Sequence, residues 1–374
     1  QYGTYQHTQT DGLEGSLDSV LKIRGLTNPA QFRSPKRDIT DGASREISII
    51  AGTSTGDNKG HVEAYFTWRK NEAVLQANRN FSACTIGGQN KANFNGGLQP
   101  IAGFPANTQF RCGGSATASP AAFTNFATFD YSIDPTTGNT FIAGHHGLLD
   151  PNDVADQYNF GPLNYYQRPD ERYSFGAFSN YNITPGIEMY AQLMLTDYNS
   201  NAQIAPSGAF FNTSTISCGN PLLSNSQATP LGCTAADIAN SRTFDQTGAG
   251  ADVNKNVYIG RRNTEGGGRQ DYRNLWSYRT TVGFRGGLWD GWNYDLSGQR
   301  SRTSLSQVYR NDFSVTKLLR SFDVIDPDGA GPLGPTCRSV KNGTDKSCVP
   351  YNVFTLSGFT GGFTGAETGG VSAA

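Results

Sequence analysis

The sequence predicts an all-β fold of long antiparallel strands, and three observations support this. Residues of strictly alternating character recur along the chain; within residues 61–70, for example, Val62, Ala64, Phe66 and Trp68 share one face. A period of two is the pattern of a strand with one dry face. The connections between these strands are of two kinds: some are short and rich in glycine, and the others are very long and polar. Short turns at one end and long loops at the other are typical of a transmembrane antiparallel β-barrel.

The composition favours a barrel wall over a large packed core. The chain has 374 residues, of which 36% are hydrophobic, with 45 Gly, 17 Tyr and 22 Phe. A wall with a wet lumen needs apolar side chains only at every second position, and aromatics and glycines are typical of its girdles and turns. A soluble, Gly-rich β-solenoid or sandwich is the competing interpretation. The net charge of −1 gives no electrostatic basis for binding nucleic acid.

The alternation defines seven strands, and shorter elements lie between them. In chain order, we expect strands at residues 2–8, 45–53, 61–70, 172–183, 187–197, 271–285 and 292–309. We expect short turns at residues 56–60, 184–186 and 286–290, turns of helix at 17–23 and 235–239, and a short strand at 256–261.

Two arginines assign the faces of the predicted sheet. Arg279 and Arg285 lie on one face of residues 271–285, opposite the aromatic side chains. An arginine that faces lipid near the midplane costs about 2–4 kcal/mol, so we expect this face to line the lumen. Trp289 and Trp292, beside a short turn, fit an interfacial aromatic anchor.

Seven strands are too few for the barrel that such long loops indicate. The largest barrels have about 22 strands and a plugged lumen. We therefore expect residues 1–374 to be the N-terminal part of such a barrel, with the plug domain and the C-terminal strands outside this sequence. The first residues contain no secretory leader, and the last contain no aromatic-ended strand, in line with this expectation.

Six cysteines form three sequence-local pairs inside predicted long loops: Cys84/Cys112, Cys218/Cys233 and Cys337/Cys348. An even number of loop cysteines predicts disulfides formed in an oxidising compartment. Fifteen connectivities are possible, and the segregation of the cysteines into separate loops favours the local one. Metal binding is the alternative, although no pair has the Cys-x-x-Cys spacing.

Five segments, in order along the chain, share a loose pattern: residues 163–173, 202–211, 260–269, 311–315 and 337–352. Together they resemble TonB-dependent receptors, especially the large receptors of alphaproteobacteria. The resemblance implies a receptor embedded in outer-membrane lipid of a bacterium. It would import a scarce extracellular ligand, such as a ferric siderophore or an oligosaccharide, with energy from the TonB complex. The plug and the TonB-contacting box of that family are not in this sequence.

Two groups are candidate ligand-binding residues. Arg261, Arg262 and Arg269 flank a glycine run in an expected outer loop, where a flexible basic segment would suit an anionic chelate. A solvated loop, or an ion pair between loops, is the alternative.

The second group is Tyr165, Tyr166 and Arg168, which follow the first long loop. Their rings suit stacking on a sugar or chelate, or anchoring at the membrane interface.

Metal binding, cofactors and catalysis are not expected. His145 and His146 are adjacent in an expected extended loop, so their side chains would point apart. Residues 326–329 begin like a calcium loop but lack its later ligands. No nucleophile elbow or phosphate loop is present, which argues against an enzyme. A passive porin and a secreted β-rich adhesin or surface-layer protein are the alternatives to a receptor.

Overall fold

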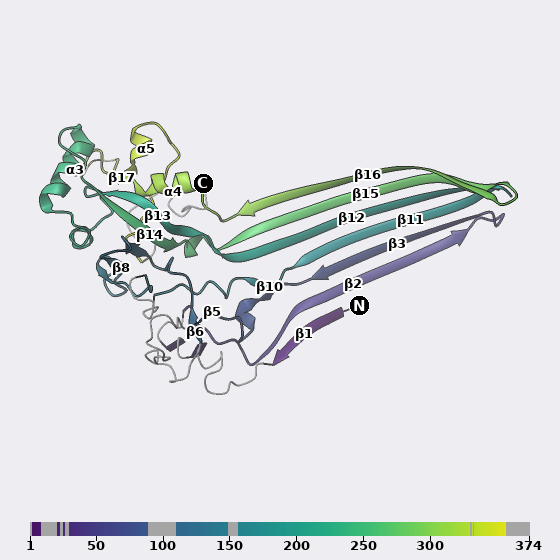
Figure 1. Ribbon diagram of the computed structural model, residues 1–374, viewed down its shortest axis with the longest axis horizontal. Helices are drawn as coiled ribbons and strands as arrows, with labels where there is room; N and C mark the ends of the chain where they lie inside the picture. Colours follow the sequence, from purple (N-terminus) through teal and green to yellow (C-terminus); the bar gives the residue numbers. More distant parts are fainter. Residues whose placement is uncertain are drawn as a thin grey trace.

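The computed structural model describes residues 2–8, 21–22, 25–26, 30–88, 110–148, 156–329, 331 and 333–356. Its main feature is an antiparallel seven-stranded sheet, which we call the long sheet (Figure 1). In spatial order its strands are β1 (Tyr2–Thr8), β2 (Asp38–Ser54), β3 (Gly60–Asn71), β11 (Asp170–Thr184), β12 (Ile187–Pro206), β15 (Gly268–Trp289) and β16 (Trp292–Arg310). The all-β class and the seven expected strands are confirmed, and in the described residues the sheet is open, with β1 and β16 at its edges.

The three short connections lie together at one end of the long sheet (Figure 1). The turn predicted at residues 286–290 was wrong, because β15 continues to Trp289, which pairs with Trp292. The connection is therefore only Asp290 and Gly291, and Gly291 has a φ of 82°. Glycine adopts this left-handed conformation without the cost of a Cβ clash.

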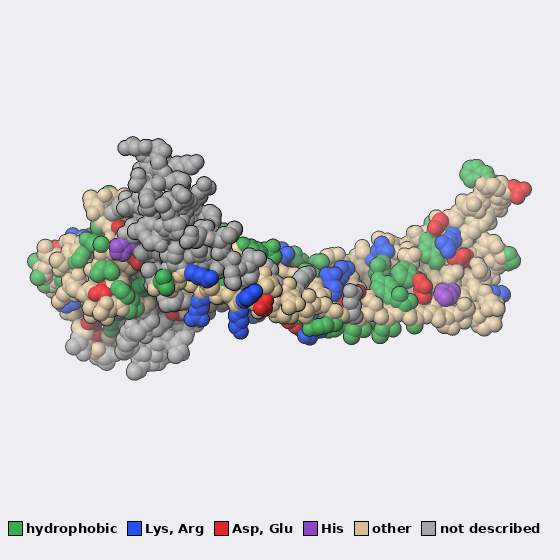
Figure 2. Space-filling model, turned by 90° about the horizontal axis from the view of Figure 1, so that it is seen from below, with side chains coloured by type: hydrophobic (Ala, Val, Ile, Leu, Met, Phe, Trp, Pro, Cys, Tyr) green, Lys and Arg blue, Asp and Glu red, His purple; other side chains and the backbone are tan. Residues whose placement is uncertain are grey.

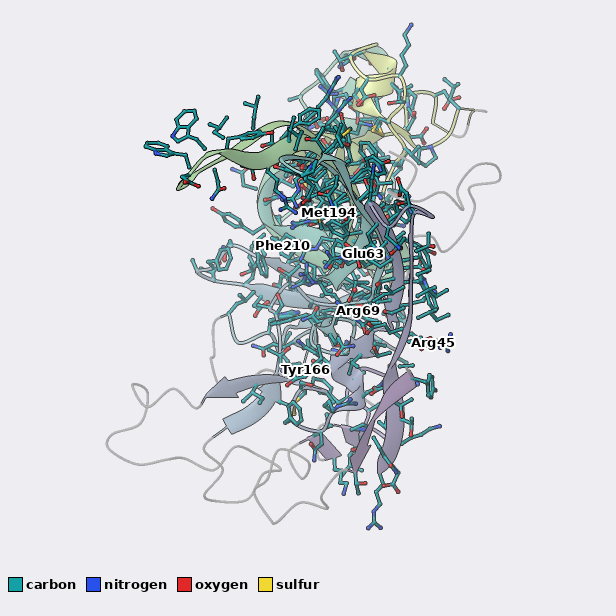
Figure 3. The ribbon with its side chains drawn as sticks, turned by 90° about the vertical axis from the view of Figure 1, so that its right-hand side faces the viewer. Arg45, Glu63, Arg69, Tyr166, Met194 and Phe210 are labelled. Atoms are coloured by element: carbon teal, nitrogen blue, oxygen red, sulfur yellow. A yellow bond between two sulfur atoms is a disulfide. The ribbon has the colours of Figure 1, made fainter. Side chains whose placement is uncertain are left out.

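The register gives each face of the long sheet a predominant character. Ala177 pairs with Ala64 and with Leu193, so side chains of one parity lie together across the strands. One face carries Ile47, Ile49, Phe66, Phe175, Leu195, Val282, Phe284 and Leu296, whereas the other carries Glu63, Arg69, Gln192, Thr196, Arg279 and Arg285. Figure 3 shows that the sheet curves, with Glu63 and Arg69 on its concave side and Arg45 on its convex side. The polar face is therefore concave and the apolar face convex.

Aromatic residues mark both ends of the apolar convex face. At the end near the long loops, Trp68 pairs with Tyr173, and Trp276 lies in the same row two strands beyond Tyr173, with Asp197 of β12 between them. At the short-turn end lie Trp289 and Trp292, which are 66% and 62% exposed. From Trp276 to Trp289 the strand spans about 43 Å at about 3.3 Å per residue, or about 30 Å along the membrane normal at a tilt of about 45°.

The long loops fold into a second unit, which we call the head (Figure 1, left). Its five-stranded sheet has the order β13 (Gly208–Ser217), β14 (Asn254–Arg262), β7 (Ala122–Thr124), β8 (Asp130–Ile133) and β9 (Phe141–Ala143). Four helices accompany it: α2 (Asn225–Ala228), α3 (Ala235–Thr247), α4 (Val315–Phe322) and α5 (Arg338–Lys341). The core contains Phe123, Ile259 and Phe322, one from each of three loops, so these loops fold as one body.

Local sequence explains the longest helix and one of the head strands. Thr234 and Asp237 form a capping box at the start of α3, and Gly248 ends it with a φ of 76°. The predicted turn of helix at residues 235–239 is thus confirmed and longer, and β14 confirms the short strand expected at 256–261. The helix expected at 17–23 lies mostly outside the described residues.

The smaller elements lie in the loops. They are β4 (Val74–Leu75), η1 (Gln76–Asn78), β5 (Thr85–Gly88), β6 (Phe110–Gly113), β10 (Tyr165–Gln167), η3 (Thr264–Gly266), β17 (Val324–Ile325) and β18 (Thr336–Cys337). Among the described residues, no helix has both the length and the apolar character needed to cross a membrane.

Three disulfides brace the loops, and the local pairing is confirmed. Cys84 is bonded to Cys112, Cys218 to Cys233 and Cys337 to Cys348, with Cα–Cα distances of 5.5, 5.7 and 6.1 Å. The second bridge lies in the core of the head, whereas the first belongs to a smaller cluster with Leu21 and Phe32.

Candidate functional site

Arg261 is the centre of a buried polar network in the head. Its side chain is on β14 and is 2% exposed. The guanidinium donates to the hydroxyl of Tyr351 at 3.0 Å and to the carbonyl oxygens of Pro120 and Thr355 at 3.0 and 2.9 Å. It also forms an ion pair of 2.7 Å with Glu265. These acceptors belong to all three long loops, so Arg261 holds the loops together.

Arg262, the next residue of β14, is also buried, and its guanidinium stacks on aromatic rings. Its guanidinium lies 4.8 Å from the ring centre of Phe210 and 5.4 Å from that of Tyr158, and it donates to the carbonyl of Pro206 at 2.9 Å. Burial lowers the pKa of Arg262 to about 10. The side chain therefore stays a cation at neutral pH.

Arg269 is on β15, where its Nε donates to the carbonyl of Ala205 at 3.1 Å and its guanidinium lies 5.8 Å from the Phe210 ring. The expectation that Arg261 and Arg262 lie in a flexible loop was therefore wrong. Both are in an ordered strand, because acceptors and rings distant in sequence surround them. Phe210 is 44% exposed, so Arg269 and Phe210 form the accessible part of this group.

The second predicted group lies between the head and the long sheet. Tyr165 and Tyr166 are in β10, which pairs with β4. Tyr166 is 61% exposed, and its ring meets that of Phe81 edge to face at a centroid distance of 5.8 Å. Burial opposes ionisation of Asp271, but hydrogen bonds donated by Arg273 and Gln307 lower its pKa, and the positive charge of Arg168 adds to this lowering. An exposed aromatic pair suits stacking on a planar or sugar ligand.

His146, expected in an extended loop, is held in the head by carboxylates. Its side chain is fully buried, and Nδ1 is 2.9 Å from Oδ1 of Asp130, on β8. Its Nε2 is 3.9 Å from the carboxylate of Asp156. Carboxylates that are distant in sequence thus order this loop. No group of three or more His, Cys, Asp or Glu side chains is placed to hold a metal ion in the part of the chain that the structure describes.

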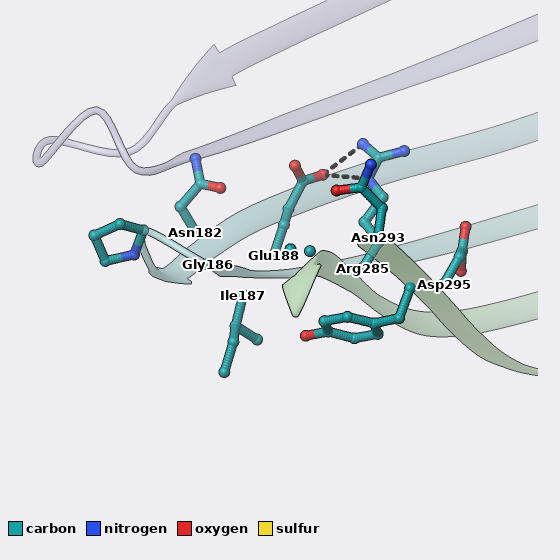
Figure 4. Close-up of a pocket in the computed structure, with 11 residues that line it drawn as sticks. Asn182, Gly186, Ile187, Glu188, Arg285, Asn293 and Asp295 are labelled. Atoms are coloured by element: carbon teal, nitrogen blue, oxygen red, sulfur yellow. Dashed lines mark hydrogen bonds and ion pairs between the residues drawn. The ribbon is translucent and has the colours of Figure 1, made fainter. Parts of the chain in front are cut away.

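The concave face of the long sheet carries a charged cluster near the short turns. Glu188 accepts from Nε of Arg285 at 3.1 Å, and the hydroxyl of Tyr190 donates to Asp295 at 2.7 Å. Figure 4 shows Glu188, Arg285 and Asp295 on one side of the sheet and Ile187 on the other. Glu188, Arg285 and Asp295 contribute to the lining of a hollow of about 500 Å³. Arg285 was predicted on this face, but no sequence pattern indicated the cluster.

A second hollow lies beside the first, towards β3. Its volume is about 410 Å³, and its lining includes His61, Glu63, Gln192 and Arg285. Both hollows present charged and amide groups and belong to the same concave face. This face therefore suits water, a polar ligand or a polar protein surface.

No protein-family profile matches this chain, and comparisons with curated proteins and with solved structures find no match. The structure therefore defines a class by geometry: an antiparallel sheet with one polar and one apolar face, joined to a disulfide-braced head.

Proposed function

We propose that this chain forms part of the wall and the outer loops of a TonB-dependent receptor in the bacterial outer membrane. The receptor imports a scarce ligand, such as a ferric siderophore or an oligosaccharide, with energy supplied through the TonB complex. The observation that carries the membrane part of this proposal is the apolar convex face. Ile49, Val62 and Leu296 are 58%, 47% and 70% exposed on it, and no layer of the described residues covers it.

Lipid is the environment that suits such a face. Soluble proteins rarely leave a contiguous apolar surface of this extent exposed. The aromatic rows at both ends match the girdles of a membrane barrel, and the curvature puts the polar face inside. Figure 2 shows hydrophobic side chains along the long sheet, and several Lys and Arg side chains where the sheet meets the head.

The connections support an orientation with the head outside the cell. In outer-membrane barrels the short turns face the periplasm and the long loops face outwards. Disulfides in each long loop agree with assembly in an oxidising compartment. The candidate contacts for an incoming ligand are Phe210 and Arg269 in the head region, and Tyr166 between the head and the long sheet.

The intact mass of the natural polypeptide in detergent-extracted outer membranes tests the architecture. We expect a mass far above the 40.3 kDa of these residues, because the plug and the remaining strands must be present. A polypeptide of 40.3 kDa, or one that is soluble without detergent, would favour the adhesin or surface-layer alternative.

Ligand accumulation separates an active receptor from a passive porin. We expect cells that carry the protein to concentrate a ferric siderophore or an oligosaccharide, and an uncoupler of the proton-motive force to abolish this. Equal uptake with and without the uncoupler would support the porin instead.

A further inference from the structure

Two arginines interrupt the apolar convex face on its last strand. Arg300 pairs with Thr280 and Arg302 with Tyr278, so both share the face of Val282 and Phe284. Both side chains are exposed. On the neighbouring strand β15, the same two levels carry a hydroxyl and an aromatic ring, with no charge.

Within the described residues, these two arginines lack the side-chain partners that Arg279 and Arg285 of the concave face have. On the concave face, Arg285 pairs with Glu188 and Arg279 contacts the sulfur of Met194 at 3.1 Å. Arg300 and Arg302 form no ion pair or hydrogen bond with any residue that the structure describes. A guanidinium in an apolar surface that faces lipid requires an anion or water within its reach.

The level of the pair on the strand identifies where that anion lies. Arg302 is two residues from Ser304, which pairs with Trp276 in the aromatic row near the head. Two residues span about 7 Å of strand, and arginine side chains extend to place their charge at the interface. The guanidinium of Arg302 thus reaches the headgroup level, and that of Arg300 follows about 7 Å below it.

We propose that Arg300 and Arg302 bind the phosphate of an anionic lipid in the leaflet next to the head. This inference rests on the membrane location proposed above. Two guanidinium groups on one strand face match a phosphate, which accepts several charge-assisted hydrogen bonds at once. We assign the phosphate to a lipid because the residues near the two arginines on this face, Leu296 and Tyr278, suit acyl chains.

Native mass spectrometry of the protein that carries this sequence tests the inference. The protein is reconstituted into vesicles of phosphatidylcholine with an equal amount of phosphatidic acid, and the lipids that remain after mild detergent extraction are identified. We expect the wild type to retain phosphatidic acid in preference to phosphatidylcholine. We expect the ratio of retained phosphatidic acid to phosphatidylcholine to fall at least about tenfold in the R300Q/R302Q variant. In R302Q alone, we expect this ratio to fall by less.

Arg279→Gln is the matched control. Arg279 pairs with Ser301 and so lies at the same level of the sheet on the opposite face. We expect this variant to keep the preference for phosphatidic acid. Equal retention of both lipids by the wild type, an equal loss in R279Q, or a second polypeptide bound in place of lipid would overturn the lipid site while leaving the membrane proposal intact. A wild-type protein that fails to float with vesicles would overturn both.

Discussion

The Nε of Arg261 donates to the hydroxyl of Tyr351 at 3.0 Å, and this bond joins β14 to a segment 90 residues further along the chain. Both side chains are 2% exposed. Burial raises the pKa of Tyr351, so its hydroxyl stays protonated. The ring of Tyr351 also stacks on that of Phe322 at 6.1 Å, which connects the bond to α4. The buried cation therefore fixes how two loops meet.

Arg261→Met is expected to loosen the head. The variant removes the Arg261 donor from Glu265 and from two carbonyl oxygens, and breaking a buried pair costs about 3–5 kcal/mol. Hydrogen exchange of the β14 amides is expected to accelerate by at least about 100-fold, at about 1.4 kcal/mol per factor of ten.

Arg320→Met is the control for that experiment. Arg320 also pairs with a carboxylate in the head, Asp345 at 3.0 Å, but its side chain is 40% exposed. Such a pair contributes about 0–1 kcal/mol, so exchange is expected to change less than about tenfold. Similar rates in both variants would show that Arg261 does not hold the loops together.

The strands of the long sheet could be predicted because their pattern is local. Alternation in residues 172–183 and 271–285 follows directly from one dry and one wet face. The extension of β12 beyond residue 197 was missed because it is polar on both faces: Asn199 and Ser200, for example, are paired with β15 and lie beyond the aromatic row. Hydrogen-bonded pairing continues there without any apolar periodicity.

The packing of the long loops into one head could not be predicted, because it depends on contacts between residues that are distant in sequence. Arg261 precedes Gly266, Gly267 and Gly268, and this composition suggested a flexible loop. Its acceptors, Pro120 and Thr355, are 141 and 94 residues away. Val257 and Ile259, buried at alternate positions of β14, were the one local indication of an ordered strand.

Loss of the Cys218–Cys233 bridge is expected to destabilise the head. The bridge closes a separation of 15 residues. A loop of that length corresponds to about 3 kcal/mol of unfolded-state entropy. The double Cys→Ser variant is expected to lower the urea midpoint for exchange of the β14 amides.

The Cys84–Cys112 bridge provides the comparison. It belongs to the separate cluster with Leu21 and Phe32. Its double Cys→Ser variant is expected to leave the β14 amides unchanged and to affect β5 and β6. If both variants altered β14 equally, the two clusters would not be independent.

Asp57 is expected to make the β2–β3 turn sensitive to acid. Its pKa is lowered to about 2, first by a hydrogen bond from Thr55, then by the Lys59 amide and the Tyr181 hydroxyl. A depressed pKa means that the carboxylate stabilises the turn at neutral pH and down to about pH 4, and that this stabilisation is lost as the pH falls towards 2.

Titration of the Asp57 carboxyl by NMR checks this expectation. Tyr181→Phe removes one donor at 2.9 Å and is expected to raise the pKa of Asp57, whereas Tyr173→Phe, whose hydroxyl bonds Glu171, is expected to leave it unchanged. An ordinary aspartate midpoint in the wild type would contradict the hydrogen-bonded turn.

Two adjacent residues of β15 test which face meets lipid. Val282 pairs with Ala191 on the convex face, and Thr281 pairs with Gln192 on the concave face. Val282→Asp is expected to impair insertion into the outer membrane. The free-energy cost of placing this carboxylate in lipid is less than the roughly 2–4 kcal/mol of an Arg or Lys at the midplane. It is well above the cost of a substitution that faces the lumen. Thr281→Asp adds the same charge one residue away and is expected to insert like the wild type, because the concave face already carries Glu63 and Glu188. The measurement is the fraction of each variant that reaches the heat-modifiable, protease-resistant form in outer membranes. Equal assembly of the two variants would mean that the convex face does not meet lipid, and a greater loss for Thr281→Asp would reverse the two faces.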